Sequence, residues 1–236
     1  MLVVVAGRGD RGASALVERW RSFDAGLLTP EDLSRPGWRY QPDEPSAPSM
    51  AVVGGAVVEA GSIRGVLTRL PCVVPDDLPH IVPEDRAYVA SEMTAFLTAW
   101  LAARTCPVLN RPAAGSLAGP CWGRERWVRL AGQLGVPARP VIRRASLGAD
   151  EPGEEVDGRV MSVTVVAGRA FGLAEGQLHG WARRLAEACR AELLVTHFVD
   201  DGAGPVLLAA DVWPDMARPE IADAALAYLL GGGGGP

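Results

Sequence analysis

The chain begins with the residues LVVVAGRGDRG at positions 2–12, and this stretch decides the class of fold. Residues 2–6 form an uninterrupted apolar run rich in valine, which is typical of a strand buried on both faces of a parallel sheet. The glycines that follow end the strand. From Ala13 to Phe23, apolar residues recur at helical spacing, so a strand, a loop and a helix follow one another. This order predicts an α/β domain with a parallel sheet.

The glycine loop has two interpretations. Gly7, Gly9 and Gly12 match the pattern GxGxxG between a predicted strand and a predicted helix, which is the context of a dinucleotide-binding loop. The N-terminus of the following helix could then hold a phosphate group. However, Asp10 would place a negative charge at that position, and no second nucleotide-binding half is visible downstream. A loop that only turns the chain is the favoured interpretation, and phosphate binding by the three glycines is the alternative.

Composition excludes several classes of protein. The 236 residues are 48% hydrophobic and 22% charged, as in ordinary globular domains. All 23 basic residues are arginine, so the chain has no lysine for a Walker A loop, a Schiff base or a pyridoxal-phosphate anchor. The net charge of -5 gives no positive field for nucleic acid or anionic lipid. We therefore expect neither a nucleic acid nor a membrane as a partner.

The four cysteines form no CxxC pair, and no basic segment precedes a long apolar run at the N-terminus. Both observations favour a reduced, cytoplasmic protein.

Hairpins and amphipathic helices are predicted along the rest of the chain. Hairpins are expected at 50–59, around Gly54-Gly55, and at 160–171, around Ala167-Gly168. The clearest helix spans 84–104, with Tyr88 among the apolar residues that return every three or four positions. An acidic stretch at 146–158 indicates a linker. Further strands are expected at 63–67, 108–109, 193–199 and 206–210, and further helices at 124–134, 177–190 and 219–230.

The usual catalytic and metal-binding patterns are absent from the sequence. The three histidines, at 80, 179 and 197, form no HxH or HExxH spacing, and no GxSxG motif occurs. Four carboxylates gather near two predicted strands, and their oxygens would suit Mg²⁺. Solvent-exposed acids at turns and strand ends are the favoured interpretation of this group. The four are Asp200, Asp201, Asp211 and Asp215.

Four stretches between residues 62 and 140 together resemble the N-terminal half of ATP-grasp ligases, in the group of peptide-modifying and ribosomal-protein-glutamate-ligase-like enzymes. They are VLTRLP at 66–71, EDRAYVASE at 84–92, PVLNRP at 107–112 and WVRLA at 127–131. The resemblance implies a pre-ATP-grasp-like α/β domain over 1–115 and a reduced, smaller α+β ATP-grasp-like subdomain over 116–230. A disordered glycine tail at 231–236 follows.

The chain departs from the family pattern at two places. The lid subdomain, whose lysines hold the ATP phosphates in the family, is expected to be deleted, because residues 142–144 run through the short linker into a hairpin that resembles the one after the lid. At the family's Glu-x-Asn metal motif, this chain has Asp211 and Trp213. The resemblance implies that Asp211 could still ligate a metal, whereas Trp213 has no acceptor oxygen. Asp211, together with Asp201 from the carboxylate group above, is the metal candidate.

The resulting hypothesis is a degenerate ATP-grasp-like protein that binds a peptide or small carboxylate substrate in a modification or biosynthetic pathway. Arg69, Asn110 and Arg111 are the polar residues predicted near the substrate cleft. The first alternative is an active ATP- and Mg²⁺-dependent carboxylate-amine ligase that uses arginine in place of lysine, completed by a partner subunit. The second is a nucleotide-binding regulatory domain that uses the glycine loop. Apolar stripes on three helices would also allow a homodimer.

Overall fold

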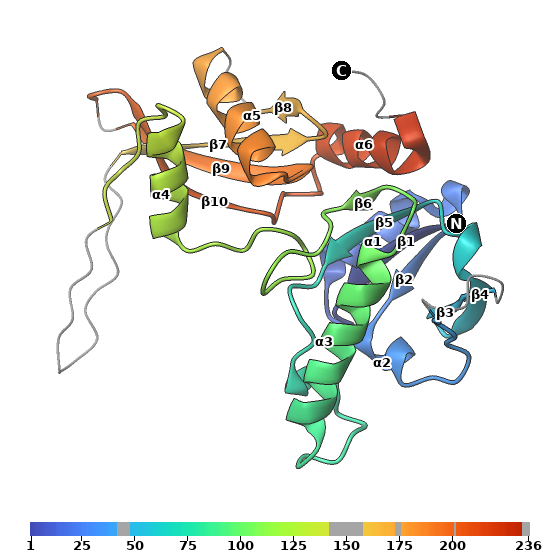
Figure 1. The fold of residues 1–236 in the computed structure, drawn as a ribbon. Helices are drawn as coiled ribbons and strands as arrows, with labels where there is room; N and C mark the ends of the chain where they lie inside the picture. The colour runs from blue at the N-terminus through green and yellow to red at the C-terminus, as the bar shows by residue number, and fades with distance from the viewer. Residues whose placement is uncertain (42–47, 142–157, 173–175, 201, 233–236) are drawn as a thin grey trace. The chain divides into compact units, whose positions relative to one another are not determined.

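The computed structural model describes residues 1–41, 48–141, 158–172, 176–200 and 202–232 (Figure 1). The chain divides into two compact units. The first unit comprises Met1–Cys121 and Asp215–Pro236, and the second unit comprises Trp122–Pro214. The last helix therefore lies with the first unit, whereas the division by sequence grouped it with 116–230. Most of the expected linker at 146–158, and residues 233–236 of the expected tail, lie outside the described residues.

The first unit is built on a four-stranded parallel sheet in the order β2-β1-β5-β6, which confirms the class predicted from residues 2–12. All five residues of β1 are fully buried, as expected for a strand covered on both faces. The strands are β1 (Leu2–Ala6), β2 (Ala25–Leu28), β5 (Gly65–Arg69) and β6 (Val108–Leu109). The strand predicted at 63–67 thus begins two residues later, because Ile63 follows a short 3₁₀ turn at Ala60–Ser62.

Helices cover both faces of this sheet (Figure 1). Val3 and Val5 share one core cluster with Leu97 and Trp100 of α3, and alternation along the strand directs Leu2 and Val4 to the opposite face. The helices of the unit are α1 (Arg11–Arg19), α2 (Pro30–Leu33), α3 (Arg86–Ala102) and α6 (Pro219–Ala227), with 3₁₀ turns at Arg21–Phe23 and Pro75–Asp77 and a final π turn at Tyr228–Gly232.

The C-terminal helix is held to the first unit by specific contacts. Arg19 of α1 forms an ion pair with Asp223 of α6 at 2.7 Å. Gly65 of β5 lies so close to the final turn that a Cβ atom there would be 2.6 Å from the carbonyl oxygen of Leu229. Glycine is therefore required at this position for the last turn to reach the sheet.

A two-stranded hairpin accompanies the parallel sheet and matches its prediction residue by residue. Strands β3 (Met50–Val53) and β4 (Ala56–Glu59) pair antiparallel. Gly54 and Gly55 both have positive φ, at 58° and 80°, as a two-residue hairpin turn requires.

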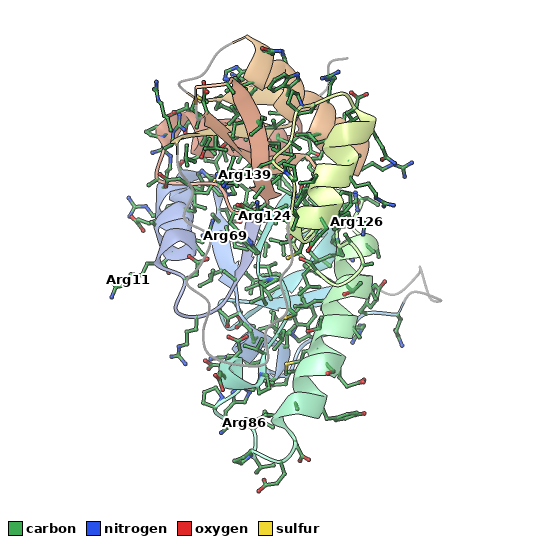
Figure 2. All side chains as sticks on the ribbon, turned by 90° about the vertical axis from the view of Figure 1, so that its left-hand side faces the viewer. Arg11, Arg69, Arg86, Arg124, Arg126 and Arg139 are labelled. Carbon is green, nitrogen blue, oxygen red and sulfur yellow. The ribbon has the colours of Figure 1, made fainter. Side chains whose placement is uncertain are left out.

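The second unit has a four-stranded antiparallel sheet in the order β10-β9-β7-β8. Helix α5 (Gln177–Cys189) packs on one face, where Trp181 meets Phe198 with ring centroids 5.9 Å apart. Helix α4 (Arg124–Gln133) lies along β10, and Arg124, labelled in Figure 2, donates a hydrogen bond to the Leu208 carbonyl. The strands are β7 (Arg159–Val166), β8 (Arg169–Phe171), β9 (Leu193–Asp200) and β10 (Pro205–Asp211), so the predicted hairpin around Ala167-Gly168 is confirmed.

No helix in the described part of the chain is long and apolar enough to cross a membrane.

Candidate functional site

The glycine loop lies at the switch point of the parallel sheet. From β1 the chain crosses to β2 on one side, and β5 then pairs with β1 on the other side. The carboxyl ends of β1 and β5 therefore lie side by side, where open α/β sheets form their ligand crevices. The loop after β1 and Arg69 at the end of β5 come together there. A Cβ atom on Gly12 would be only 3.2 Å from the Arg69 guanidinium.

Asp10 is the residue that joins the loop to Arg69. Arg69 donates from Nε to Asp10 Oδ2 at 2.8 Å and from Nη2 to Oδ1 at 3.4 Å. The Asp10 carboxylate also accepts from the backbone N–H of Ala13, as the N-cap of α1. In Figure 2, Arg69 lies over the strands of the first unit, whereas the exposed Arg11 points away from them. A carboxylate of the chain itself thus occupies the helix N-terminus that a phosphate would need.

The electrostatics of Asp10 follow from this geometry. Burial raises the pKa of Asp10, but the hydrogen bonds from Arg69 and Ala13 and the Arg69 charge outweigh it, so the pKa lies below its ordinary value. The side chains of Arg69 and Asp10 are only 18% and 23% exposed, so solvent screens the pair less than a surface ion pair.

We expect Asp10→Asn to reduce the acid sensitivity of the first unit. A depressed folded-state pKa stabilises the fold above the ordinary pKa of aspartate, and this stabilisation is lost as the pH falls through the folded-state pKa. Asparagine retains the N-cap acceptor and removes only the charge. Urea unfolding at several pH values between about 5 and 2 should show a flatter fall in the free energy of unfolding than in the unaltered protein.

The matched control is Asp223→Asn, which removes an exposed ion pair of similar length. An Asp10→Asn profile that falls as steeply as those of the control and the unaltered protein would contradict the role given to the Arg69 pair.

A pocket of about 310 Å³ opens beside Gly9. Its lining carries three carboxylates and one guanidinium, and the guanidinium of Arg8 is already paired with Glu31 at 2.7 Å. Glu31 also accepts from Arg35, and these two arginines lower its pKa. This charge balance disfavours a phosphate group. The lining residues are Arg8, Gly9, Pro30, Glu31, Asp76, Asp77, Pro79 and His80.

Asn110 and Arg111 make contacts with the backbone of their own unit. Asn110 is 2% exposed, follows a cis peptide bond and donates from its amide to the Ala118 carbonyl at 3.1 Å. The Arg111 guanidinium donates to the carbonyls of Ala102, Arg104 and Cys106 at and beyond the end of α3. The structure thus brings the glycine loop and Arg69 together. Asn110 and Arg111, the other two predicted substrate residues, instead donate hydrogen bonds to backbone carbonyls of other segments.

Asp211 stands at the end of β10 with both carboxylate oxygens bonded. Oδ2 is 2.8 Å from His197 Nε2, and Oδ1 accepts from the backbone N–H of Trp213 at 2.7 Å. His197 Nδ1 is in turn 2.9 Å from the Ser162 hydroxyl. Among the described residues, no three His, Cys, Asp or Glu side chains gather as a metal site would require. Asp201, the second metal candidate, lies outside the described residues.

The sequence did not predict the hydrogen-bonded row of His197 and Ser162 beside Asp211. Ser162 and His197 belong to no short motif, and only the pairing of β7, β9 and β10 brings them together. The only sequence signal for Ser162 and His197 was their position within two predicted strands, the first strand of the 160–171 hairpin and the strand at 193–199.

No family model and no curated protein matches the chain. Solved structures do match over nearly its whole length. A RiPP-associated ATP-grasp ligase of Chryseobacterium gregarium, in complex with ADP and a leader and core peptide, superposes with a TM-score of 0.70 at 7% identity, covering 100% of this chain and 97% of that one.

Two further structures superpose with slightly lower TM-scores. The macrocyclase MdnC of Microcystis aeruginosa, bound with its precursor peptide MdnA, gives a TM-score of 0.66 at 10% identity and covers 98% of this chain and 100% of that one. The ATP-grasp ligase PsnB, complexed with a minimal precursor, Mg and ADP, gives 0.66 at 13% identity and covers 97% and 98%. The expected fold class is confirmed, and this chain shares its fold with these ATP-grasp ligases.

Proposed function

We propose that this chain is a peptide-binding protein built on an ATP-grasp fold and that it does not perform classical ATP-dependent ligation. The observation that carries the proposal is the hydrogen bonding of the Asp211 carboxylate. Asp211 is the residue that the resemblance assigns to the family's metal carboxylate, and both of its oxygens are bonded to groups of the chain itself, His197 and the Trp213 backbone.

The hydrogen bonding of Asp211 matters because of the chemistry that ligation requires. Forming an acyl phosphate from a carboxylate brings negatively charged groups together, so catalysis needs cations and Mg²⁺ to offset the charge. The chain has no lysine, and the resemblance matches Trp213 to the family's metal-binding asparagine. The lid expected to be deleted would fall at 142–157, outside the described residues. These features together favour binding over ligation.

A peptide is the partner that the structural neighbours support. The MdnC structure is bound with a precursor peptide, and the PsnB structure is complexed with a minimal precursor. In this chain, we place the peptide at the carboxyl ends of β1 and β5, beside Arg69. The guanidinium has five N–H donors, and Asp10 takes two of them. The remaining donors suit a carboxylate of the bound peptide or of a small substrate.

Calorimetric titration with ATP and ADP, with and without Mg²⁺, tests the absence of ligation chemistry. We expect no heat at concentrations that would detect a Kd of about 1 mM, which corresponds to about -4 kcal/mol. Binding that strengthens with Mg²⁺ and is lost in Asp211→Ala would instead establish the active-ligase alternative.

A third outcome of the same titration is Mg²⁺-independent nucleotide binding that is lost in Gly9→Glu. Gly9 has open space around it, so the substitution adds a negative charge to the loop without a steric conflict. This outcome would establish the nucleotide-binding regulatory alternative.

Selection from a phage-displayed library of random peptides tests the binding itself. We expect enrichment of peptides that contain Asp or Glu, and a loss of affinity of at least about tenfold, or about 1.4 kcal/mol, in Arg69→Ala. Arg19→Ala is the matched control, because it also removes an arginine ion pair with an aspartate from the first unit. Equal affinity in the two variants would remove Arg69 from the proposal.

A further inference from the structure

Three polar side chains form a continuous hydrogen-bonded row across three neighbouring strands of the second unit. Ser162 of β7 lies directly opposite His197 of β9 in the antiparallel register. Asp211 of β10 lies two residues beyond Ala209, which is the residue opposite His197. The hydroxyl is 2.9 Å from Nδ1 and the carboxylate is 2.8 Å from Nε2, so the imidazole bridges the other two groups.

The chemistry of the three groups sets the direction of the hydrogen bonds. An ionised carboxylate can only accept, so Nε2 of His197 must carry the hydrogen that it donates to Asp211. In the neutral imidazole, Nδ1 then has a free lone pair, and the Ser162 hydroxyl donates to it. The backbone N–H of Trp213 holds the other oxygen of Asp211 and fixes the carboxylate. The arrangement is that of a nucleophile, its base and the group that orients the base.

The row is accessible from solvent. Neighbouring residues of a strand point to opposite faces, so His197 faces away from Phe198, which packs under α5. Ser162 is exposed, and the side chains of His197 and Asp211 are 29% and 38% exposed. A small electrophile can therefore reach the Ser162 oxygen.

We propose that Ser162 is a nucleophile for acyl transfer, activated by His197 and oriented through Asp211, and that it takes acyl groups from activated esters. Oγ bonds to the ester carbonyl carbon while His197 Nδ1 takes the hydroxyl proton. The C–O bond to the leaving alcohol then breaks, and the proton passes from His197 to the departing oxygen. Water attacks the acyl-serine by the same route and releases the carboxylic acid. This activity goes beyond peptide binding and needs neither a nucleotide nor a peptide.

A fluorophosphonate probe tests the proposal, with the labelled residue located by peptide mass spectrometry. In that reaction the Oγ–P bond forms, the P–F bond breaks, His197 takes the hydroxyl proton and fluoride leaves. We expect Ser162 to be labelled at least about a hundredfold faster than other exposed serines, in line with the contribution of a positioned base. Ser14 and Ser91 are internal controls, because both are exposed and donate to backbone carbonyls.

Variants separate the proposal from adventitious reactivity. Ser162→Ala should abolish the label, and His197→Ala should reduce its rate to that of Ser91. Asp211→Asn should slow labelling as well, because an amide can donate to Nε2 and reverse the tautomer. Circular dichroism identifies any variant that fails to fold. Labelling of Ser162 no faster than Ser91, or unchanged in folded His197→Ala, would overturn the proposal, whatever the outcome of the nucleotide and peptide experiments.

Discussion

Trp100→Ala is expected to lower the free energy of unfolding by about 3–5 kcal/mol, the range for a fully buried large aromatic residue. Trp100 has no exposed surface and lies in the core cluster between α3 and the parallel sheet. Its ring meets Trp38 edge-on at 5.7 Å, and the Arg104 guanidinium lies 4.8 Å from the ring centroid. Alanine would remove these contacts and leave a cavity. Denaturant unfolding monitored by circular dichroism measures the loss.

Two further variants identify the cause of that loss. Among the described residues, the indole N–H of Trp100 has no hydrogen-bond partner. Trp100→Phe should therefore cost much less than alanine, since it retains an aromatic ring and removes an unpaired donor. Tyr88→Ala, on the same helix but at a residue 69% exposed, should change stability by less than about 0.5 kcal/mol. A phenylalanine variant as unstable as the alanine variant would contradict this account.

The exposure of Tyr88 also shows where helical periodicity misleads. The spacing of apolar residues over 84–104 predicted the helix and included Tyr88 in its apolar stripe. The helix is confirmed as Arg86–Ala102, but its buried residues are Ala90, Leu97, Trp100 and Leu101. Periodicity identifies an apolar stripe on a helix. How much of that stripe is buried depends on the segments that pack against the helix.

Short elements of the first unit escaped prediction for a related reason. Strand β2 has four residues and contains Gly26, where a Cβ would be 2.8 Å from a methyl group of Val53. Its glycine serves tertiary packing, so no strand propensity is visible locally. Helix α2 does have a sequence signal, the order Thr29, Pro30 and Asp32 at a helix start. In the structure, Pro30 occupies the first helical position and the Thr29 backbone N–H donates to the Asp32 carboxylate.

The candidate site residues differ in the same way. Some follow from local sequence patterns, whereas others depend on how the strands pair. Gly7, Gly9 and Gly12 were predicted from the GxGxxG pattern between a strand and a helix, and Arg69 was predicted from the resemblance to ATP-grasp ligases. The parallel pairing of β1 and β5 brings them to one edge of the sheet. The row of Ser162, His197 and Asp211 depends on strand register, including an irregularity in β10 between Leu207 and Ala209. A shift of one residue would send alternate side chains to the other face, so sequence spacing alone could not bring them together.

Phe198→Ala is expected to destabilise the second unit by about 3–5 kcal/mol. Phe198 is fully buried in the central part of the sheet and packs against Trp181 of α5. Its removal leaves a cavity between the helix and β9, where the neighbouring strands cannot close without breaking their ladders. Phe198→Leu retains most of the volume and should cost less than about 1.5 kcal/mol.

The neighbouring residue provides the sharpest control for this prediction. His197 is adjacent to Phe198 but lies on the opposite, accessible face, so His197→Ala should cost less than about 1 kcal/mol in denaturant unfolding. The two variants should therefore separate stability from chemistry: Phe198→Ala weakens the fold, whereas His197→Ala leaves the fold and removes the reactivity of Ser162. If His197→Ala destabilises the chain as much as Phe198→Ala, the hydrogen-bonded row is a structural brace of the sheet.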